Sequence, residues 1–174
     1  MIEIKNIFKS FGKSEVLNDI SAKFERGKTN LIIGQSGSGK TVLLKCLLGL
    51  YSIDQGELIY DSIYSSKMND EEKVNIKKDM GMVFQGSALF DSLTVLENVR
   101  FPLDMLTKYS EKKKNEIALK FIDRVNLNDA INKLPSEISG GMQKRVGIAR
   151  AIVLNPKYLF CDEPNSCLLY TSDA

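Results

Sequence analysis

This sequence contains no histidine and no tryptophan among its 174 residues. The absence of histidine excludes catalysis by a His general base and metal sites built on imidazole ligands. The three cysteines, Cys46, Cys161 and Cys167, form no CxxC pair and are odd in number. That pattern fits a protein of a reducing cytosol better than a disulfide framework.

Long hydrophobic runs and an excess of one charge are missing too. No stretch approaches 18 uninterrupted apolar residues, and "MIEIKNIFKS" at the N-terminus lacks the apolar region of a signal peptide, so the sequence predicts no membrane span. Lys plus Arg outnumber Asp plus Glu by only 24 to 22, which gives no electrostatic reason to expect a nucleic-acid partner. Any association with a membrane is therefore expected to run through a partner protein. The 43% hydrophobic content suits one globular domain.

Two strands are expected to open the chain as an antiparallel pair. Apolar residues alternate in "IEIKNIF", and a second extended stretch runs from Val16 to Phe24 after a turn around Gly12. The apolar run "TNLIIG" (29–34) then predicts a strand covered on both faces, followed by a Gly-rich loop and the helix "TVLLKCLLGL" (41–50). This order of strand, loop and helix predicts an α/β fold.

The rest of the chain has the pattern of short strands around a helical block. The strands are "GELIY" (56–60), "GMVFQ" (81–85) and "KYLFCDE" (157–163), the last ending in acids. Between them, "SEKKKNEIALKFIDRVNL" (110–127) has helical spacing and Ser110 as its N-cap. We expect a helical insertion over about residues 87–135, and a helical subdomain over about residues 87–150 when the helix "MQKRVGIARAIVL" is included.

The strongest motif is a phosphate-binding loop. "GQSGSGKT" matches the pattern G-x-x-x-x-G-K-[ST] and lies between an apolar run and a helix, where the motif requires it. Its glycines allow successive backbone N–H groups to turn toward phosphates, and the helix N-terminus adds its positive dipole end. Lys40 can reach the β- and γ-phosphates, and the Thr41 hydroxyl can bind Mg²⁺. The predicted nucleotide-binding residues of this loop are Gly34, Gln35, Ser36, Gly37, Ser38, Gly39, Lys40 and Thr41.

An acidic pair supplies the complementary half of such a site. "YLFCDE" ends in Asp162, which in a P-loop fold can hold Mg²⁺ through water, and in Glu163, which can orient or deprotonate the attacking water. An apolar run ending in Asp-Glu is, by itself, an ordinary strand end. Together with the phosphate loop it favours nucleotide hydrolysis.

A second glycine pair indicates how many copies of the chain act together. Gly140 and Gly141 follow Ser139 and open a helix, which predicts a second anion-binding helix N-terminus without a Walker-type lysine. One nucleotide does not need two such sites in one chain. We therefore expect the second site to contact the γ-phosphate held by another copy, with ATP sandwiched in a homodimer.

In this order the motifs resemble the ABC transporter ATPase family over residues 1 to about 166. The resemblance implies a P-loop NTPase core with an N-terminal antiparallel β subdomain, with ATP and Mg²⁺ as ligands. It implies that Phe11 stacks on the adenine, and that Gln85 of "GMVFQ" reaches Mg²⁺ and the attacking water. It also implies that "GSALFDSLTVLENVRFPL" (86–103) docks an integral-membrane permease at the cytoplasmic face of the bacterial inner membrane. The alternative for that segment is core of the helical insertion.

Within the family, "QGSALFDSLTVLENVRFPL" and "SGGMQKRVGIARA" look most like the Mla/Mce type, which implies a phospholipid cargo. The signature departs from the common LSGGQ at Ile138 and at Met142, and Met142 fits this subgroup. Three alternatives remain open. They are an ABC ATPase for another cargo such as an amino acid or a lipoprotein, a soluble ABC protein acting on DNA or ribosomes, and a nucleotide-binding remnant without turnover.

The family continues its Walker B motif with S-x-L-D and later a switch histidine, whereas here Leu169 stands where Asp is expected. We therefore expect a nucleotide-binding domain that is incomplete at its C-terminus, with weak or no turnover of its own, and a non-native tail over residues 167–174. The alternative is a short, degenerate paralogue.

Overall fold

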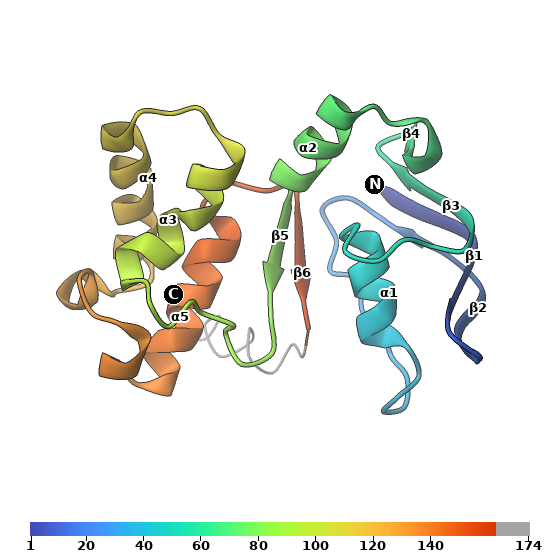
Figure 1. Cartoon of the computed structure of the whole chain (residues 1–174), viewed down its shortest axis with the longest axis horizontal. Helices are drawn as coiled ribbons and strands as arrows, with labels where there is room; N and C mark the ends of the chain where they lie inside the picture. The colour runs from blue at the N-terminus through green and yellow to red at the C-terminus, as the bar shows by residue number, and fades with distance from the viewer. Residues whose placement is uncertain (163–174) are drawn as a thin grey trace. The chain divides into compact units, whose positions relative to one another are not determined.

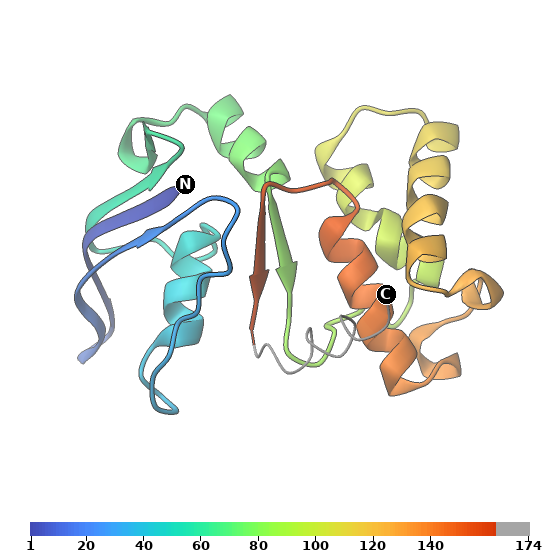
Figure 2. The same cartoon turned by 180° about the vertical axis from the view of Figure 1, so that it is seen from behind.

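The structure is a computed structural model that describes residues 1–162. The chain divides after Ile76 into two compact units. Figure 1 draws the helices and strands with the labels used below, and Figure 2 shows them from behind. Each unit has its own sheet and its own buried residues.

An antiparallel sheet of four strands, in the order β2-β1-β3-β4, forms the first unit. β1 (Ile2–Phe11) pairs with the edge strand β2 (Ser14–Phe24) in antiparallel orientation, so the predicted antiparallel opening is confirmed. On its other edge, β1 pairs with β3 (Gln55–Tyr60), which is followed by β4 (Ile63–Tyr64). β1 buries Ile2 and Ile4 at the two-residue period of a strand, and an irregularity between Ile4 and Ile7, where Asn6 has φ of 47°, shifts the period so that Ile7 is buried as well.

Helix α1 (Lys40–Leu47) packs its apolar face into this unit through Leu43, Cys46 and Leu47. The buried Tyr60 hydroxyl donates a 2.6 Å hydrogen bond to the Leu47 carbonyl oxygen, which fixes β3 to the end of α1. Burial raises the pKa of that tyrosine, so its hydroxyl stays protonated as the donor. The unit continues through a short 3-10 turn (Ser65–Lys67) into α2 (Asp70–Lys78).

The strand predicted over residues 29–34 does not form, and that prediction was wrong. Neither sheet of the described residues includes this run, and Leu31 and Ile33 are 65% and 84% exposed. An apolar sequence alone does not make a buried strand, because a strand is stabilised by hydrogen bonds to neighbouring strands. Here the run passes as irregular backbone into the glycine loop.

The second unit combines a parallel pair of strands with three helices. β5 (Met80–Val83) pairs in parallel with β6 (Tyr158–Cys161). The helices are α3 (Val95–Leu106), α4 (Glu111–Arg124) and α5 (Gly140–Ile152), joined by 3-10 turns at Asn128–Ala130 and Pro135–Glu137. Both views show α3, α4 and α5 packed together. Gly81 lets β5 approach α5, because a β-carbon there would lie 2.2 Å from the Ala151 carbonyl oxygen.

Three side-chain caps begin these helices. Thr94 caps α3 in a capping box with Glu97, Ser110 caps α4 as predicted, and Ser139 caps α5. The helices enclose one apolar cluster, made of Val95, Val99, Leu103, Ala118, Phe121, Ile122, Leu127, Ala130, Ile138, Val146, Ala149 and Val153. Within residues 1–162, none of the helices combines the length and apolar content needed to cross a bilayer.

Candidate nucleotide-binding residues

The glycine loop of the first unit closes around its own lysine. The Lys40 ammonium donates hydrogen bonds of 2.7 Å to the carbonyl oxygens of both Gly34 and Gln35. Gly37 and Gly39 adopt left-handed backbone angles, with φ of 80° and 88°, which glycine permits without steric cost. The loop residues from Gly34 to Ser38 are exposed. An anion at this site would therefore contact backbone N–H groups and the Lys40 ammonium, at the N-terminus of a helix.

The end of this loop lies directly against β2. A β-carbon at Gly39 would be 2.9 Å from the Val16 carbonyl oxygen and 3.1 Å from the Leu17 side chain. Only glycine fits there, for space as well as for its φ. α1 starts at the next residue, and the Gly39 carbonyl accepts the Leu43 N–H at 2.8 Å. The loop is thereby positioned by the sheet as well as by the helix that follows it.

The predicted base-stacking residue, Phe11, is the last residue of β1 and is 43% exposed. Its ring packs against Tyr51 in an edge-on arrangement, with centroids 5.3 Å apart and ring planes at 71°. The ammonium of Lys9 lies 5.3 Å from the Phe11 centroid. The Phe11 ring is thus partly exposed and packs against neighbouring side chains, in the same unit as the phosphate loop.

In the second unit, two predicted residues follow the ends of the parallel strands. Val83 pairs with Cys161, and the Asp162 N–H donates to the Val83 carbonyl oxygen at 3.1 Å. Because parallel strands end at the same edge of a sheet, Asp162 and the exposed Gln85 leave β6 and β5 on the same side. Glu163, the predicted general base, lies outside the described residues.

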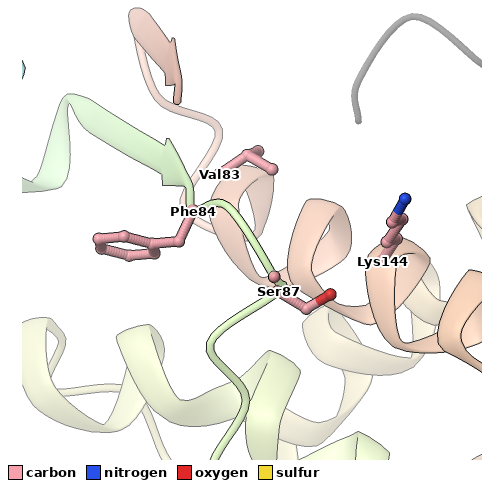
Figure 3. Close-up of a pocket in the computed structure, with 5 residues that line it drawn as sticks. Val83, Phe84, Ser87 and Lys144 are labelled. Atoms are coloured by element: carbon pink, nitrogen blue, oxygen red, sulfur yellow. The ribbon is translucent and has the colours of Figure 1, made fainter. Parts of the chain in front are cut away.

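A small hollow surrounds the turn that contains Gln85. It is lined by Val83, Phe84, Gly86, Ser87 and Lys144 (Figure 3). Lys144 comes from α5 and is exposed. The turn and the helix of the second glycine pair therefore share one concave surface within this unit.

The second glycine pair opens α5 as predicted. The Ser139 hydroxyl accepts the Met142 N–H at 3.3 Å, and Gly140 and Gly141 are exposed in the first turn. Both departures from the common signature have a packing role, because Ile138 is buried and Met142 packs against the apolar cluster. The start of the helix is open to an anion, while its flanking apolar residues fix it to the core.

The donor atoms of the predicted metal residues fit Mg²⁺. Thr41 offers a hydroxyl, Asp162 a carboxylate and Gln85 an amide oxygen, and Mg²⁺ prefers oxygen ligands completed by waters and phosphates. Each unit thus carries oxygen donors of the kind that Mg²⁺ binds, Thr41 in the first and Gln85 and Asp162 in the second, and the metal itself stays a prediction.

Sequence analysis missed three residues whose contacts fix parts of the candidate site. Tyr51 packs on Phe11, Asn98 is completely buried in α3, and Arg150 donates to the carbonyl oxygens of the turn after Gln85. Only Tyr51 left a sequence signal, as an aromatic residue in the turn-rich "GLYSIDQG". The other two lie inside regular helical patterns.

The glycine loop closes around a lysine at a helix N-terminus, and the chain also carries a strand-end acid and a second glycine pair. These features are typical of a P-loop nucleotide-binding protein. The sequence profile of the ABC transporter family matches residues 17–166. The L-cystine import ATP-binding protein TcyC of Bacillus subtilis is 40% identical over 171 residues, which are 97% of this chain and 69% of that protein. The glutamine transport ATP-binding protein GlnQ of Escherichia coli is 40% identical over 168 residues, 97% of this chain and 70% of that protein.

A third relative, the probable ribonucleotide transport ATP-binding protein mkl of Mycobacterium leprae, is 39% identical over 96% of this chain. The chain spans only 48% of that protein. Among solved structures, the dimer of the ABC transporter cassette MJ0796 matches with a TM-score of 0.84 and 34% identity, over 97% of this chain and 76% of that one. Its post-hydrolysis dimer with ADP and Pi matches with a TM-score of 0.82 and 32% identity, over 100% of this chain and 77% of that one.

The chain belongs to the ABC transporter family. It is an ATP-binding domain of that family and has the α/β fold of an ABC cassette, as the sequence predicts.

Proposed function

We propose that this chain binds ATP with Mg²⁺ and, within its whole protein, hydrolyses ATP to drive an ABC transporter. The observation that carries the proposal is the glycine loop closed around Lys40 at the start of α1. Replacing the two loop carbonyls by phosphate oxygens would give the ammonium a stronger, charge-assisted set of partners. We propose the roles predicted above for Phe11, Gln85, Asp162 and Glu163.

The test compares ATP binding by calorimetry in single variants of the chain. Lys40→Ala should abolish measurable binding, since the ammonium is predicted to contact both the β- and γ-phosphates and each charge-assisted contact that is lost costs about 1.5 to 3 kcal/mol. Lys28→Ala is the matched control, because Lys28 is an exposed lysine of the same unit that lies before the loop. Glu163→Gln should keep ATP binding and accumulate an ATP-bound dimer on size exclusion. Equal binding by Lys40→Ala and Lys28→Ala would contradict the proposal.

We further propose a second copy of the chain and an integral-membrane permease as partners, at the cytoplasmic face of a bacterial inner membrane. The related cassettes solved as dimers support the first partner. Exposed apolar side chains of the second unit support the second. Phe90 is 42% exposed and stacks on Phe101 with centroids 4.6 Å apart, and Met105 on the same helix as Phe101 is exposed. Such a patch is typical of a protein–protein contact.

For the cargo we propose phospholipid, on the Mla/Mce-like signature with Met142. The competing candidate is an amino acid, because relatives named above are a cystine importer and a glutamine transporter. The whole protein with its permease, reconstituted in liposomes, separates the two. We expect ATP-dependent phospholipid transfer to acceptor vesicles. ATP-dependent uptake of an amino acid, without lipid transfer, would overturn the lipid assignment and leave the ATPase assignment intact.

A further inference from the structure

A chain of aromatic and cationic side chains joins the end of β1 to the end of α1 within the first unit. The Phe11 and Tyr51 rings meet edge-on at 5.3 Å between centroids. The ammonium of Lys9 lies 5.3 Å from the Phe11 centroid, and that of Lys45 lies 5.3 Å from the Tyr51 centroid. Tyr51 is therefore the link between the exposed Phe11 ring and the helix that begins at the phosphate loop.

The backbone of Tyr51 is fixed to α1. The N–H groups of Leu50 and Tyr51 both donate to the Lys45 carbonyl oxygen, at 2.8 and 3.2 Å. Gly49, with φ of 67°, supplies the left-handed turn that ends the helix. Because Lys40 is the first residue of the same helix, the tyrosine is held relative to the phosphate loop.

The other end of this connection is fixed to β1. The Asp54 N–H donates to the Phe8 carbonyl oxygen at 2.9 Å, and its carboxylate accepts from the Lys9 ammonium and the Ser10 N–H, each at 2.7 Å. These bonds hold the pKa of Asp54 below its usual value, with the Lys9 hydrogen bond the largest cause. The loop that carries Tyr51 is thus held at both ends, and its half-buried ring packs against Phe11.

We propose that Tyr51 is a positioning residue for the base of the bound nucleotide. It holds the Phe11 ring at a set distance and angle from the phosphate loop, so that the base platform is formed before the ligand arrives. Preorganisation of this kind raises affinity by removing the cost of ordering a side chain on binding. The inference rests on the proposed function, in which Phe11 stacks on adenine, and it adds a residue on which affinity for the base depends.

The experiment compares two ligands in the full chain by calorimetry, ATP and inorganic triphosphate, both with Mg²⁺. Tyr51→Leu should weaken ATP binding about threefold to tenfold, the size of an aromatic pair contact, and leave triphosphate binding unchanged. Tyr51→Phe keeps the ring and should bind ATP within about twofold of the parent chain. The ratio of the two affinities is the readout, because partial unfolding lowers binding of both ligands equally and cancels.

Tyr64→Leu is the matched control. Tyr64 is also partly exposed and has a lysine, Lys67, 5.0 Å from its centroid, but it lies on β4. It should leave the ratio unchanged. An unchanged ratio in Tyr51→Leu, or an equal change in both tyrosine variants, would overturn the inference while ATP binding itself stands. A parent chain that binds neither ligand would overturn the proposed function and the inference with it.

Discussion

At the scale of single residues, Asn98 decides the conformation of the segment after Gln85. Its side chain is fully buried in α3. Its Oδ1 accepts the Phe90 N–H at 2.9 Å, and its Nδ2 donates to the carbonyl oxygens of Phe90, Leu93 and Thr94 at 3.1, 2.9 and 3.0 Å. One buried amide therefore bonds to the backbone of three residues in the segment before α3, as a side chain with both donors and acceptors can.

We predict that Asn98→Asp lowers the free energy of unfolding at pH 7 by about 3 kcal/mol or more. A carboxylate would turn a negatively charged oxygen toward three carbonyl oxygens, so that three hydrogen bonds are replaced by repulsion. Burial would raise the pKa of the introduced carboxyl in the folded state, so the loss should shrink as the pH falls and the group takes up a proton. Urea unfolding at pH 7 and pH 4.5 measures both effects.

Asn115→Asp is the control for this change. Asn115 accepts a 2.8 Å hydrogen bond from Arg100 at a partly exposed site, so the same substitution there places a carboxylate beside a guanidinium and should cost nothing. Similar losses at both positions would show that the Asn98 contacts do not carry the effect.

At the scale of elements, Arg150 of α5 holds the turn after β5. Arg150 is 9% exposed, and its guanidinium donates to the carbonyl oxygens of Ser87 and Ala88 at 2.7 and 2.9 Å. Gly86, Ser87 and Ala88 all have positive φ, which is strained for the two residues with side chains. Burial lowers the pKa of Arg150 from its usual value, although a guanidinium remains charged.

We predict that Arg150→Met destabilises the chain by about 3 kcal/mol, because two hydrogen bonds to a charged group are lost at about 1.5 kcal/mol each. Urea unfolding measures the loss. Arg145→Met on the same helix is the comparison. Arg145 also donates to two carbonyl oxygens, Val125 and Asn126, but at 3.1 Å each and at a more exposed site. Its loss should be clearly smaller, and equal losses would contradict the role assigned to Arg150 in holding the turn after β5.

The elements that the sequence predicts correctly are those specified by local pattern. Alternation in "IEIKNIF", the serine-capped periodic stretch after Ser110 and the glycine-opened helix after Ser139 all form. The run over residues 29–34 fails because a buried strand depends on partners elsewhere in the chain. Asn98 and Arg150 could not be predicted for the same reason, since their partners are backbone groups whose positions exist only after folding.

At the scale of the whole molecule, the predicted site residues divide between the two units. Phe11 and the phosphate loop belong to the first unit, whereas Gln85, the second glycine pair and Asp162 belong to the second. Motif order in the sequence assigned Phe11, the phosphate loop, Gln85 and Asp162 to one nucleotide and the second glycine pair to the nucleotide of another copy, and these assignments stay predictions. The first unit carries an anion-binding loop and an exposed aromatic ring. The second unit carries oxygen donors at the ends of its strands and an exposed helix N-terminus.

The contact between Gly39 and β2 has a consequence for anyone who redesigns this site. At Gly39 the loop packs against the Val16 carbonyl and the Leu17 side chain. The shape of the loop therefore depends on two segments that are separate in the sequence. A loop transplanted into another scaffold would lose that contact, and a library that randomises residues 34–41 alone would sample loops that the strand rejects. Because the Val16 contact is with a backbone carbonyl that no substitution removes, productive variants should keep Gly39 and vary position 17 together with the rest of the loop.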